Sequence, residues 1–213
     1  MKAVSLVSRR ADLDRAGFRD YYETTHCPLA MQYFPFLGYT RNHLLDHPEL
    51  DFDCISEFEA PAWLDDVDVM GSRSRQLVMD DELKFMDPAR IRVAGVRRHV
   101  LITPAREAAA GRLDSRVLLL ERQGDSMLAE ARQLAEQLAS ARPDLHGMHL
   151  DLLDNDPRCP LPCNALLWID WLDRSEPLPA ALTQLPGLQR MVQVERCDTP
   201  LATLQERFVA FQP

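Results

Sequence analysis

The residue types that could do chemistry gather between Phe18 and His43. Counted at 3.6 residues per turn, Phe18, Tyr22 and His26 recur at i, i+4 and i+8, so a helix would place all three on one side. An imidazole titrates near neutrality and can move a proton to or from carbon or oxygen. The spacing therefore predicts His26 as a general acid or base, with Tyr22 beside it to bind or polarise an oxygen atom.

These residues also have structural explanations, which the sequence leaves open. A histidine at the end of a helix can hydrogen-bond a carbonyl or interact favourably with the helix dipole. A tyrosine on an apolar helix face can simply belong to the core. Phe18, on the same face, is expected to contact a substrate or to pack in that core.

A second candidate group lies on one face of the strand predicted over residues 36–47. Tyr39, Arg41 and His43 are spaced two apart, so they point to the same side of a strand. If that side lines a cavity, Tyr39 and Arg41 would bind substrate, with Arg41 as an anchor for an acidic group, and His43 would be a second acid. If it faces solvent, the three residues are polar surface.

Several carboxylates could assist a histidine. Asp53 and Glu57 share a face of the next predicted strand and could orient an imidazole as its carboxylate partner, although such positions are often solvated. The acidic run at residues 80–82 is most simply a solvated turn, although Asp81, like Asp53, is also a candidate for substrate binding. His99, in a later strand, is a further candidate.

The elements that must position these residues follow a regular order in the first half. A capping aspartate at 12 or 14 precedes a helix that we expect to end or kink near His26, because Pro28 disfavours a helical residue before it. A second helix should start at Pro61, break near Gly71 and end near Met79. Strands are expected at 2–8, 36–47, 52–59 and 91–103, which gives β-α-β-β-α-β, the ferredoxin-like order.

The second half repeats this order. We expect a helix that starts at Asp125 or Ser126, a short helix over 179–185 and an additional helix over 199–211. Strands are expected at 116–122, 145–153, 165–171 and 188–194. The predicted fold is α+β, with two ferredoxin-like domains at 1–104 and 115–213, joined by an Ala-rich linker at 105–114.

A short internal alignment supports duplication. Residues 35–46 lie over residues 143–154 at a constant shift of 108, and five of the twelve positions are identical. At that shift His26 falls on Leu134 and Tyr22 on Glu130, so a second copy would keep the scaffold and lose the chemistry. We therefore expect the active residues in the first half.

Composition excludes several classes of protein. A net charge of −9 disfavours nucleic acid as a partner, because binding depends on Lys and Arg at the phosphates. No apolar run is long enough for a membrane span and no signal peptide is evident, so a cytoplasmic location without membrane attachment is expected. The five cysteines show no disulfide framework, and the pair at 159 and 163 lacks a second pair for zinc.

Cofactor motifs are also missing from the sequence. Neither a dinucleotide-binding nor a phosphate-binding glycine loop occurs, and there is no His-Glu-x-x-His metal motif. We therefore predict no cofactor and no metal.

Four motifs follow one another in the first half: Phe18-x-x-Tyr21-Tyr22-x-x-x-His26-x-Pro28-Leu29, Phe36-Leu37-Gly38-Tyr39-x-x-Asn42, Asp53, and Asp81-Glu82-x-x-Phe85-x-Asp87. This ordered set resembles the EthD family, within the dimeric α/β-barrel superfamily that also contains muconolactone isomerases. The resemblance covers roughly residues 1–103, and the second half resembles the family only in element order, as a degenerate tandem copy. The sequence departs from the family pattern at Pro35-Phe36, which lacks the following Pro-Gly that many members have.

The resemblance implies two four-stranded antiparallel sheets packed as a barrel, from the two halves of one chain or in a homodimer. It also implies a small aromatic or polyketide-like ligand between sheet and helices, and cofactor-free isomerisation, cyclisation, dehydration or decarboxylation. The expected function is thus a cofactor-independent lyase or isomerase. The alternative is a non-catalytic small-molecule binding or accessory protein on the same fold.

Overall fold

The structure is a computed structural model that describes residues 2–47, 49–104, 113–121, 126–172 and 177–213. The chain forms two compact units. The first comprises Met1–His43, Pro48–Val93 and Cys197–Pro213, and the second comprises Leu44–His47 and Ala94–Arg196. Each unit combines antiparallel strands with helices, so the predicted mixed α+β class is confirmed.

Three antiparallel strands form the sheet of the first unit, in the order β1-β3-β2. They are β1 (Lys2–Val7), β2 (Gly38–Leu44) and β3 (Cys54–Glu59). In the register of β1 with β3, Ser5 lies opposite Ser56, and the next pair is Leu6 with Ile55. Successive side chains therefore alternate between the two faces of this sheet.

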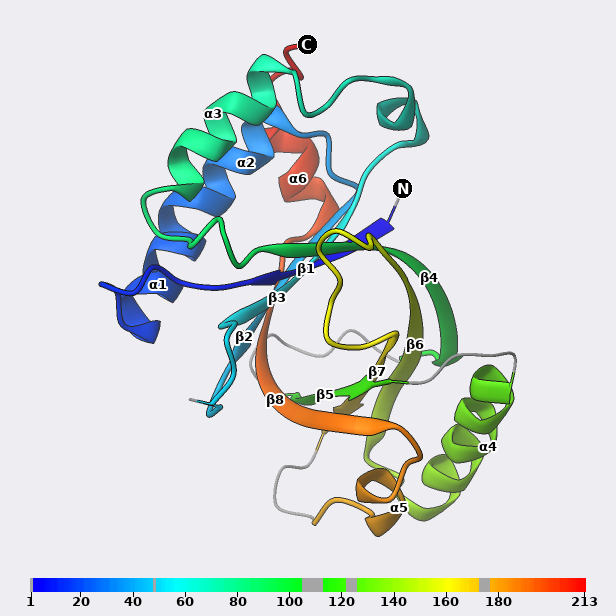
Figure 1. Ribbon diagram of the computed structural model, residues 1–213. Helices are drawn as coiled ribbons and strands as arrows, with labels where there is room; N and C mark the ends of the chain where they lie inside the picture. Colours follow the sequence, from blue (N-terminus) through cyan, green and yellow to red (C-terminus); the bar gives the residue numbers. More distant parts are fainter. Residues whose placement is uncertain (1, 48, 105–112, 122–125, 173–176) are drawn as a thin grey trace. The chain divides into compact units, whose positions relative to one another are not determined.

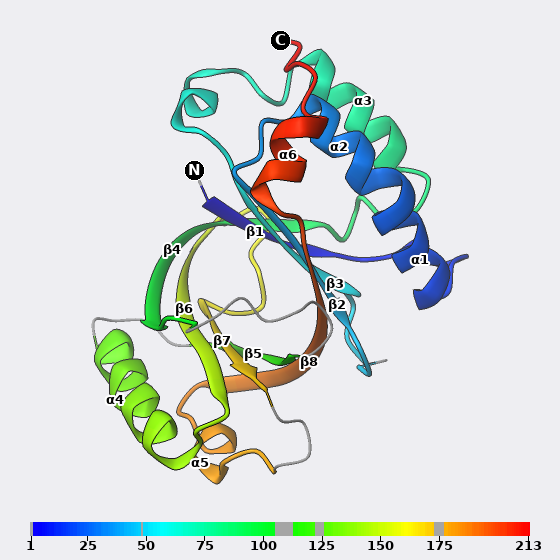
Figure 2. The ribbon, with the colours of Figure 1, turned by 180° about the vertical axis from the view of Figure 1, so that it is seen from behind.

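Helices cover one face of that sheet (Figures 1 and 2). They share with it a core that includes Phe18, Met31, Phe85 and Leu204. The helical segments are α1 (Arg15–Tyr21), a π-helical turn η1 (Tyr22–His26), α2 (Cys27–Tyr33), a 3₁₀ turn η2 (Ala62–Asp66), α3 (Arg73–Glu82) and α6 (Leu201–Arg207).

The first helix is interrupted near His26, where the sequence predicted that it ends or kinks. It does not end at His26 but continues through a π-helical turn into α2, up to Tyr33. At this turn the Cys27 N–H donates to the Tyr22 carbonyl, five residues back, and Pro28 occupies the first turn of α2, where its missing N–H matters little. The wider turn accommodates the proline and keeps Tyr22 and His26 on one buried face.

The acidic run at residues 80–82 also differs from its prediction. It is not a solvated turn but the last turn of α3, a helix capped at its start by Ser72, whose hydroxyl accepts the Arg75 N–H. The helix predicted from Pro61 is only the 3₁₀ turn η2, and α3 begins after Gly71. Asp81 is buried, at 3% exposure, because its turn faces the helix that carries His26.

The second unit contains a five-stranded antiparallel sheet in the order β4-β6-β7-β5-β8. The strands are β4 (Arg92–Ile102), β5 (Asp114–Leu120), β6 (Leu145–Asn155), β7 (Ala165–Trp171) and β8 (Leu188–Asp198). Helix α4 (Ser126–Ala141) packs against β6 through Leu134 and Leu138, and α5 (Ala180–Thr183) is a single turn. The core of this unit is apolar beneath α4.

The compact units do not coincide with the predicted halves at either end. Helix α6 belongs to the first unit, because Leu204 is buried in its core and the Val209 N–H donates to the Gln32 carbonyl at 3.0 Å. Most of β4 belongs to the second unit, because it pairs with β6 from Ala94 onward. Most of the predicted linker, residues 105–112, lies outside the described residues.

None of the helices in the described ranges is long and apolar enough to cross a membrane.

Candidate active site

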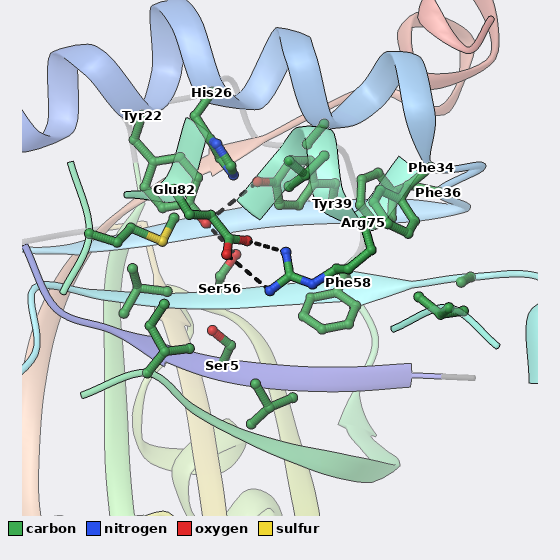
Figure 3. Close-up of a pocket in the computed structure, with 18 of the residues that line it drawn as sticks. Ser5, Tyr22, His26, Phe34, Phe36, Tyr39, Ser56, Phe58, Arg75 and Glu82 are labelled. Atoms are coloured by element: carbon green, nitrogen blue, oxygen red, sulfur yellow. Dashed lines mark hydrogen bonds and ion pairs between the residues drawn. The ribbon is translucent and has the colours of Figure 1, made fainter. Parts of the chain in front are cut away.

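A cavity of about 380 Å³ lies in the first unit, between its sheet and the helices α2 and α3. Figure 3 shows side chains from both layers converging on it. Its volume is at the lower end of the usual range for small-molecule sites, so it suits a compact ligand. The lining is mainly aromatic and aliphatic, and its polar members are Ser5, Tyr22, His26, Tyr39, Ser56, Arg75 and Glu82.

His26 and Asp81 form a buried pair at the wall of this cavity. His26 Nδ1 lies 2.9 Å from Asp81 Oδ2, and both side chains are only 4% exposed. A carboxylate can only accept here, so Nδ1 carries the proton and Nε2 carries a lone pair. Nε2 makes no hydrogen bond to any described residue, and the ring reaches into the cavity (Figure 3).

Burial holds this histidine neutral. Desolvation lowers the pKa of His26 below its usual value of 6.5, although the hydrogen bond that His26 donates to Asp81 opposes the change. Burial alone would raise the pKa of Asp81, but hydrogen bonds from His26, Tyr21 and Lys84 outweigh it and lower that pKa. The result is a neutral imidazole whose inner nitrogen is fixed by an ionised carboxylate.

Tyr21 and Lys84 complete the surroundings of Asp81. The Tyr21 hydroxyl donates to Asp81 Oδ1 at 2.8 Å, and Lys84 Nζ donates to the same oxygen at 3.1 Å. Tyr21 thus points away from Tyr22, toward α3, as helix geometry predicts. Because both donors bind Oδ1, Asp81 Oδ2 is available to accept the hydrogen bond from His26.

A chain of hydroxyl groups crosses the cavity floor. The Tyr39 hydroxyl donates to that of Tyr22 at 3.4 Å, and the Tyr22 hydroxyl donates to Ser56 Oγ at 3.0 Å. Burial raises the pKa of Tyr22 and Tyr39 far above the usual 10, so both remain protonated. The Ser56 hydroxyl has no acceptor among the described residues, and Ser5 is its register partner on the same lining. Ser56 can therefore donate to an oxygen atom of a ligand.

Arg75 and Glu82 are charged members of the lining that the sequence analysis did not select. Arg75 Nη1 and Nη2 donate to the two carboxylate oxygens of Glu82 at 2.7 and 3.0 Å. Their spacing of seven residues, two turns of α3, places both on the helix face toward the cavity. The spacing can be recognised in the sequence, but only the folded chain shows that this face of α3 borders a cavity.

The polar residues of β2 divide between two environments. Tyr39 lines the cavity, whereas Arg41 and His43 lie outside the lining and bind Glu23 of the π-helical turn. Arg41 Nη2 donates to Glu23 Oε2 at 2.7 Å, and His43 Nε2 lies 2.7 Å from Glu23 Oε1. The guanidinium also stacks over the Tyr39 ring at 4.7 Å. Arg41 therefore has a carboxylate of its own chain as its partner.

The remaining predicted residues support the fold around the site. Asp53 accepts from Arg9 and Arg15, with the Arg15 Nε bond at 2.9 Å, and so ties β3 to α1. Phe18 is buried against Tyr22 and Phe85 and does not line the cavity.

Two further candidates, Glu57 and His99, also lie outside the cavity lining. Glu57 accepts from the Asn42 amide at 3.0 Å. His99 lies in β4, within the second unit. The carboxylate that orients His26 is Asp81, rather than Asp53 or Glu57.

One group of described residues in the first unit has metal-ligand chemistry. The ligand atoms of Glu23, His43 and Cys197 lie within 4.8 Å of one another. The Arg41 guanidinium, however, already binds Glu23 and places a positive charge beside the group. A cation there would be repelled by Arg41.

Comparisons with known proteins agree with this architecture. The EthD domain family matches residues 10–89, a span almost wholly within the first unit. A comparison with curated proteins found no match.

Solved structures match over both units. A candidate monooxygenase from Fusobacterium nucleatum subsp. nucleatum ATCC 25586 has 11% identity and a TM-score of 0.54, over 92% of this chain and 91% of its own. A candidate monooxygenase from Lactobacillus acidophilus NCFM has 12% identity and a TM-score of 0.51, over 94% and 95%. An anthrone oxidase-like protein has 11% identity and a TM-score of 0.51, over 92% of each chain. At such identities the likeness to these neighbours shows the fold alone.

Proposed function

We propose that the protein is an enzyme that transfers protons on a small aromatic or polyketide-like carbonyl compound, as a cofactor-independent lyase or isomerase. The observation that carries this proposal is His26. Its Nδ1 is fixed by Asp81, while its Nε2 faces an apolar cavity without a protein partner among the described residues. A buried, neutral imidazole in this position has the properties of a general base.

The first step would be the same for isomerisation and dehydration. His26 Nε2 removes a proton from the carbon next to the carbonyl, and the electrons of the broken C–H bond form the C=C bond of an enolate. The negative charge moves to the carbonyl oxygen. Asp81 then stabilises the imidazolium, which carries a proton on each nitrogen.

Hydroxyl groups would bind the charged oxygen. Ser56 stands at the end of the donor chain from Tyr39 through Tyr22, so its hydroxyl can donate to the enolate oxygen. His26 then returns its proton. Return to a different carbon completes an isomerisation, and transfer to a departing hydroxyl group releases water and completes a dehydration.

An oxygen-dependent outcome is a second candidate. Its support is the descriptions of the neighbours as candidate monooxygenases and as anthrone oxidase-like. The carbanion that forms on the ligand when His26 removes the proton would react with O₂ instead of being reprotonated. Its electron pair would form a C–O bond, so that the carbon is oxidised and O₂ reduced, and the imidazolium proton would complete a hydroperoxide. Consumption of oxygen would distinguish this outcome from isomerisation or dehydration.

Deuterium exchange tests the shared step without knowledge of the final product. Aromatic ketones such as 1-tetralone would be incubated with the protein in D₂O, and exchange at the α-carbon followed by NMR. The wild type should accelerate exchange and the His26→Ala variant should not. Saturable binding with no exchange by the wild type would instead support the alternative of a non-catalytic binding protein.

We propose a barrel built from the antiparallel sheets, with the second half as a degenerate tandem copy, a cytoplasmic location and a homodimer as one state in solution. Light scattering during size exclusion would separate a monomer from a dimer. Neither nucleic acid nor membrane is proposed as a partner.

A further inference from the structure

We propose that Arg75 and Glu82 together bind a hydroxyl group of a neutral ligand and so determine specificity in the cavity. The inference rests on the proposed function, because it describes a second oxygen of the same ligand, apart from the reacting carbonyl. It replaces Arg41 as the expected polar anchor, since Arg41 lies outside the lining.

The hydrogen bonds of the pair leave donors and acceptors unused. A guanidinium carries five N–H donors, and Arg75 uses two of them on Glu82. The Arg75 guanidinium makes no further hydrogen bond to described residues. Each carboxylate oxygen of Glu82 accepts one of these bonds and keeps capacity for another. Unused N–H groups and unused lone pairs therefore lie side by side on the cavity wall.

A hydroxyl group matches this arrangement. It can donate its hydrogen to Glu82 and accept an N–H from Arg75 through the same oxygen atom. The rest of the surrounding lining consists largely of hydrocarbon, with Phe34, Phe36 and Phe58 on it, so an aromatic ring would pack there. The geometry thus suits a phenol-like substituent on an aromatic ketone.

Charge balance disfavours an acid at the same place. The side chains of Arg75 and Glu82 are 23% and 16% exposed, so the pair is largely removed from water. Glu82 already neutralises the guanidinium, and a ligand carboxylate would add a second negative charge beside it. A neutral hydroxyl gains both hydrogen bonds without that repulsion. His26, Arg75 and Glu82 line the same cavity, so the reacting end and this pair face one ligand.

Three matched ligands test the inference by calorimetry: 1-tetralone, 6-hydroxy-1-tetralone and 1-tetralone-6-carboxylic acid. They differ only in the substituent at one position. The wild type should bind the hydroxyl compound about tenfold more tightly than the parent, the effect of two ordinary hydrogen bonds. The acid should bind no better than the parent.

Paired substitutions show whether Arg75 and Glu82 cause this preference. The R75M/E82L variant removes both charges together and should bind the hydroxyl compound and the parent within about threefold of each other. The matched control, R158M/D156N, removes an exposed ion pair of the second unit and should keep the tenfold preference. Circular dichroism of each variant would verify folding.

The outcomes separate this inference from the proposed function. A wild-type preference for the acid or for the parent overturns it, as does a tenfold preference that persists in folded R75M/E82L. The proposed function depends instead on deuterium exchange by wild type and its loss in His26→Ala. The His26→Ala variant should retain the binding preference, because His26 takes no part in holding the hydroxyl.

Discussion

Two histidine–carboxylate pairs lie in the first unit, and their surroundings give them different properties. The His26 and His43 side chains are equally buried, and their distances to Asp81 and Glu23 are similar, 2.9 and 2.7 Å. The Nε2 atom of His26 faces the cavity, whereas His43 binds Glu23 beside Arg41 and does not line that cavity. His43 Nδ1 is buried without a hydrogen-bond partner among the described residues. A histidine bound to a carboxylate is thus a candidate base only where its second nitrogen meets a ligand.

The largest expected difference between the pairs is in turnover. Replacement of His26 by Ala should lower kcat/KM by about 10²- to 10⁴-fold, the usual contribution of a general base. Replacement of His43 by Gln should change kcat/KM by less than about threefold, because His43 does not line the cavity. Steady-state kinetics on any ketone that shows α-carbon exchange would measure both values. Equal losses in the two variants would refute the distinction.

Asp81 should have the next largest effect. In D81N the amide can donate to His26 Nδ1, which places the imidazole proton on Nε2 and removes the base. We expect a loss in kcat/KM of about 100-fold with little change in KM. The matched variant E23Q, at the other pair, should retain most of its activity. A loss confined to KM would indicate that Asp81 shapes the cavity instead of positioning the imidazole.

Glu23 should matter for stability rather than chemistry. Hydrogen bonds from His43 and Arg41 outweigh burial and lower the pKa of Glu23 from 4.5 to about 2. Replacement by Ala leaves the Arg41 charge without its partner and should lower the free energy of unfolding by about 2 kcal/mol. The expected loss of unfolding free energy is smaller than for a fully buried ion pair, because the Glu23 side chain is 24% exposed. Urea unfolding near neutral pH would measure the loss, and E82A serves as a comparison at a second ion pair.

The pH dependence should report His26. The folded-state pKa of His26 is lowered below 6.5. The imidazole therefore stays mainly neutral at pH 6.5 and becomes protonated, and inactive as a base, only at lower pH. On the acid limb kcat/KM should then decrease about tenfold per pH unit, with its midpoint below 6.5. The lowered pKa also decreases the free energy of unfolding as the pH falls from 6.5 toward the folded-state pKa of His26, because the unfolded chain takes up the proton first. A midpoint above 6.5 would contradict the effect of burial.

The smallest expected effect is that of Tyr22. In Y22F the Ser56 hydroxyl loses its donor, but its own hydrogen can still reach the ligand. The rate should fall by about three- to tenfold, the contribution of one hydrogen bond, with the ring packing against His26 unchanged. A loss as large as that in the His26 variant would make Tyr22 the proton donor itself.

Much of the fold was predictable, because its signals are local. Alternation along residues 36–47 and 52–59 placed β2 and β3, and the recurrence of Phe18, Tyr22 and His26 predicted one buried helix face. The interruption of the first helix near His26 was also predicted from Pro28, although its form is a π-helical turn, which no simple period describes. The assignment of residues 80–82 to a turn was wrong. Helix α3 continues through three acidic residues because Asp81 has buried partners.

The residues that make up the candidate site depend on which faces of the helices and strands pack against one another. Tyr39, Arg41 and His43 share one side of β2 by alternation, yet Tyr39 reaches the cavity while Arg41 and His43 meet Glu23. Sequence spacing gives the direction of a side chain but not the element opposite to it.

The sequence by itself determined the α+β class, the strands of both sheets and the helix face that carries His26, because periodicity and capping act between near neighbours along the chain. Only the tertiary structure decided that Asp81, 55 residues away, holds His26, and that Arg75 and Glu82 enter the same cavity. Those choices depend on the packing of α3 against the helix of His26, where burial and hydrogen bonding set charge and proton position.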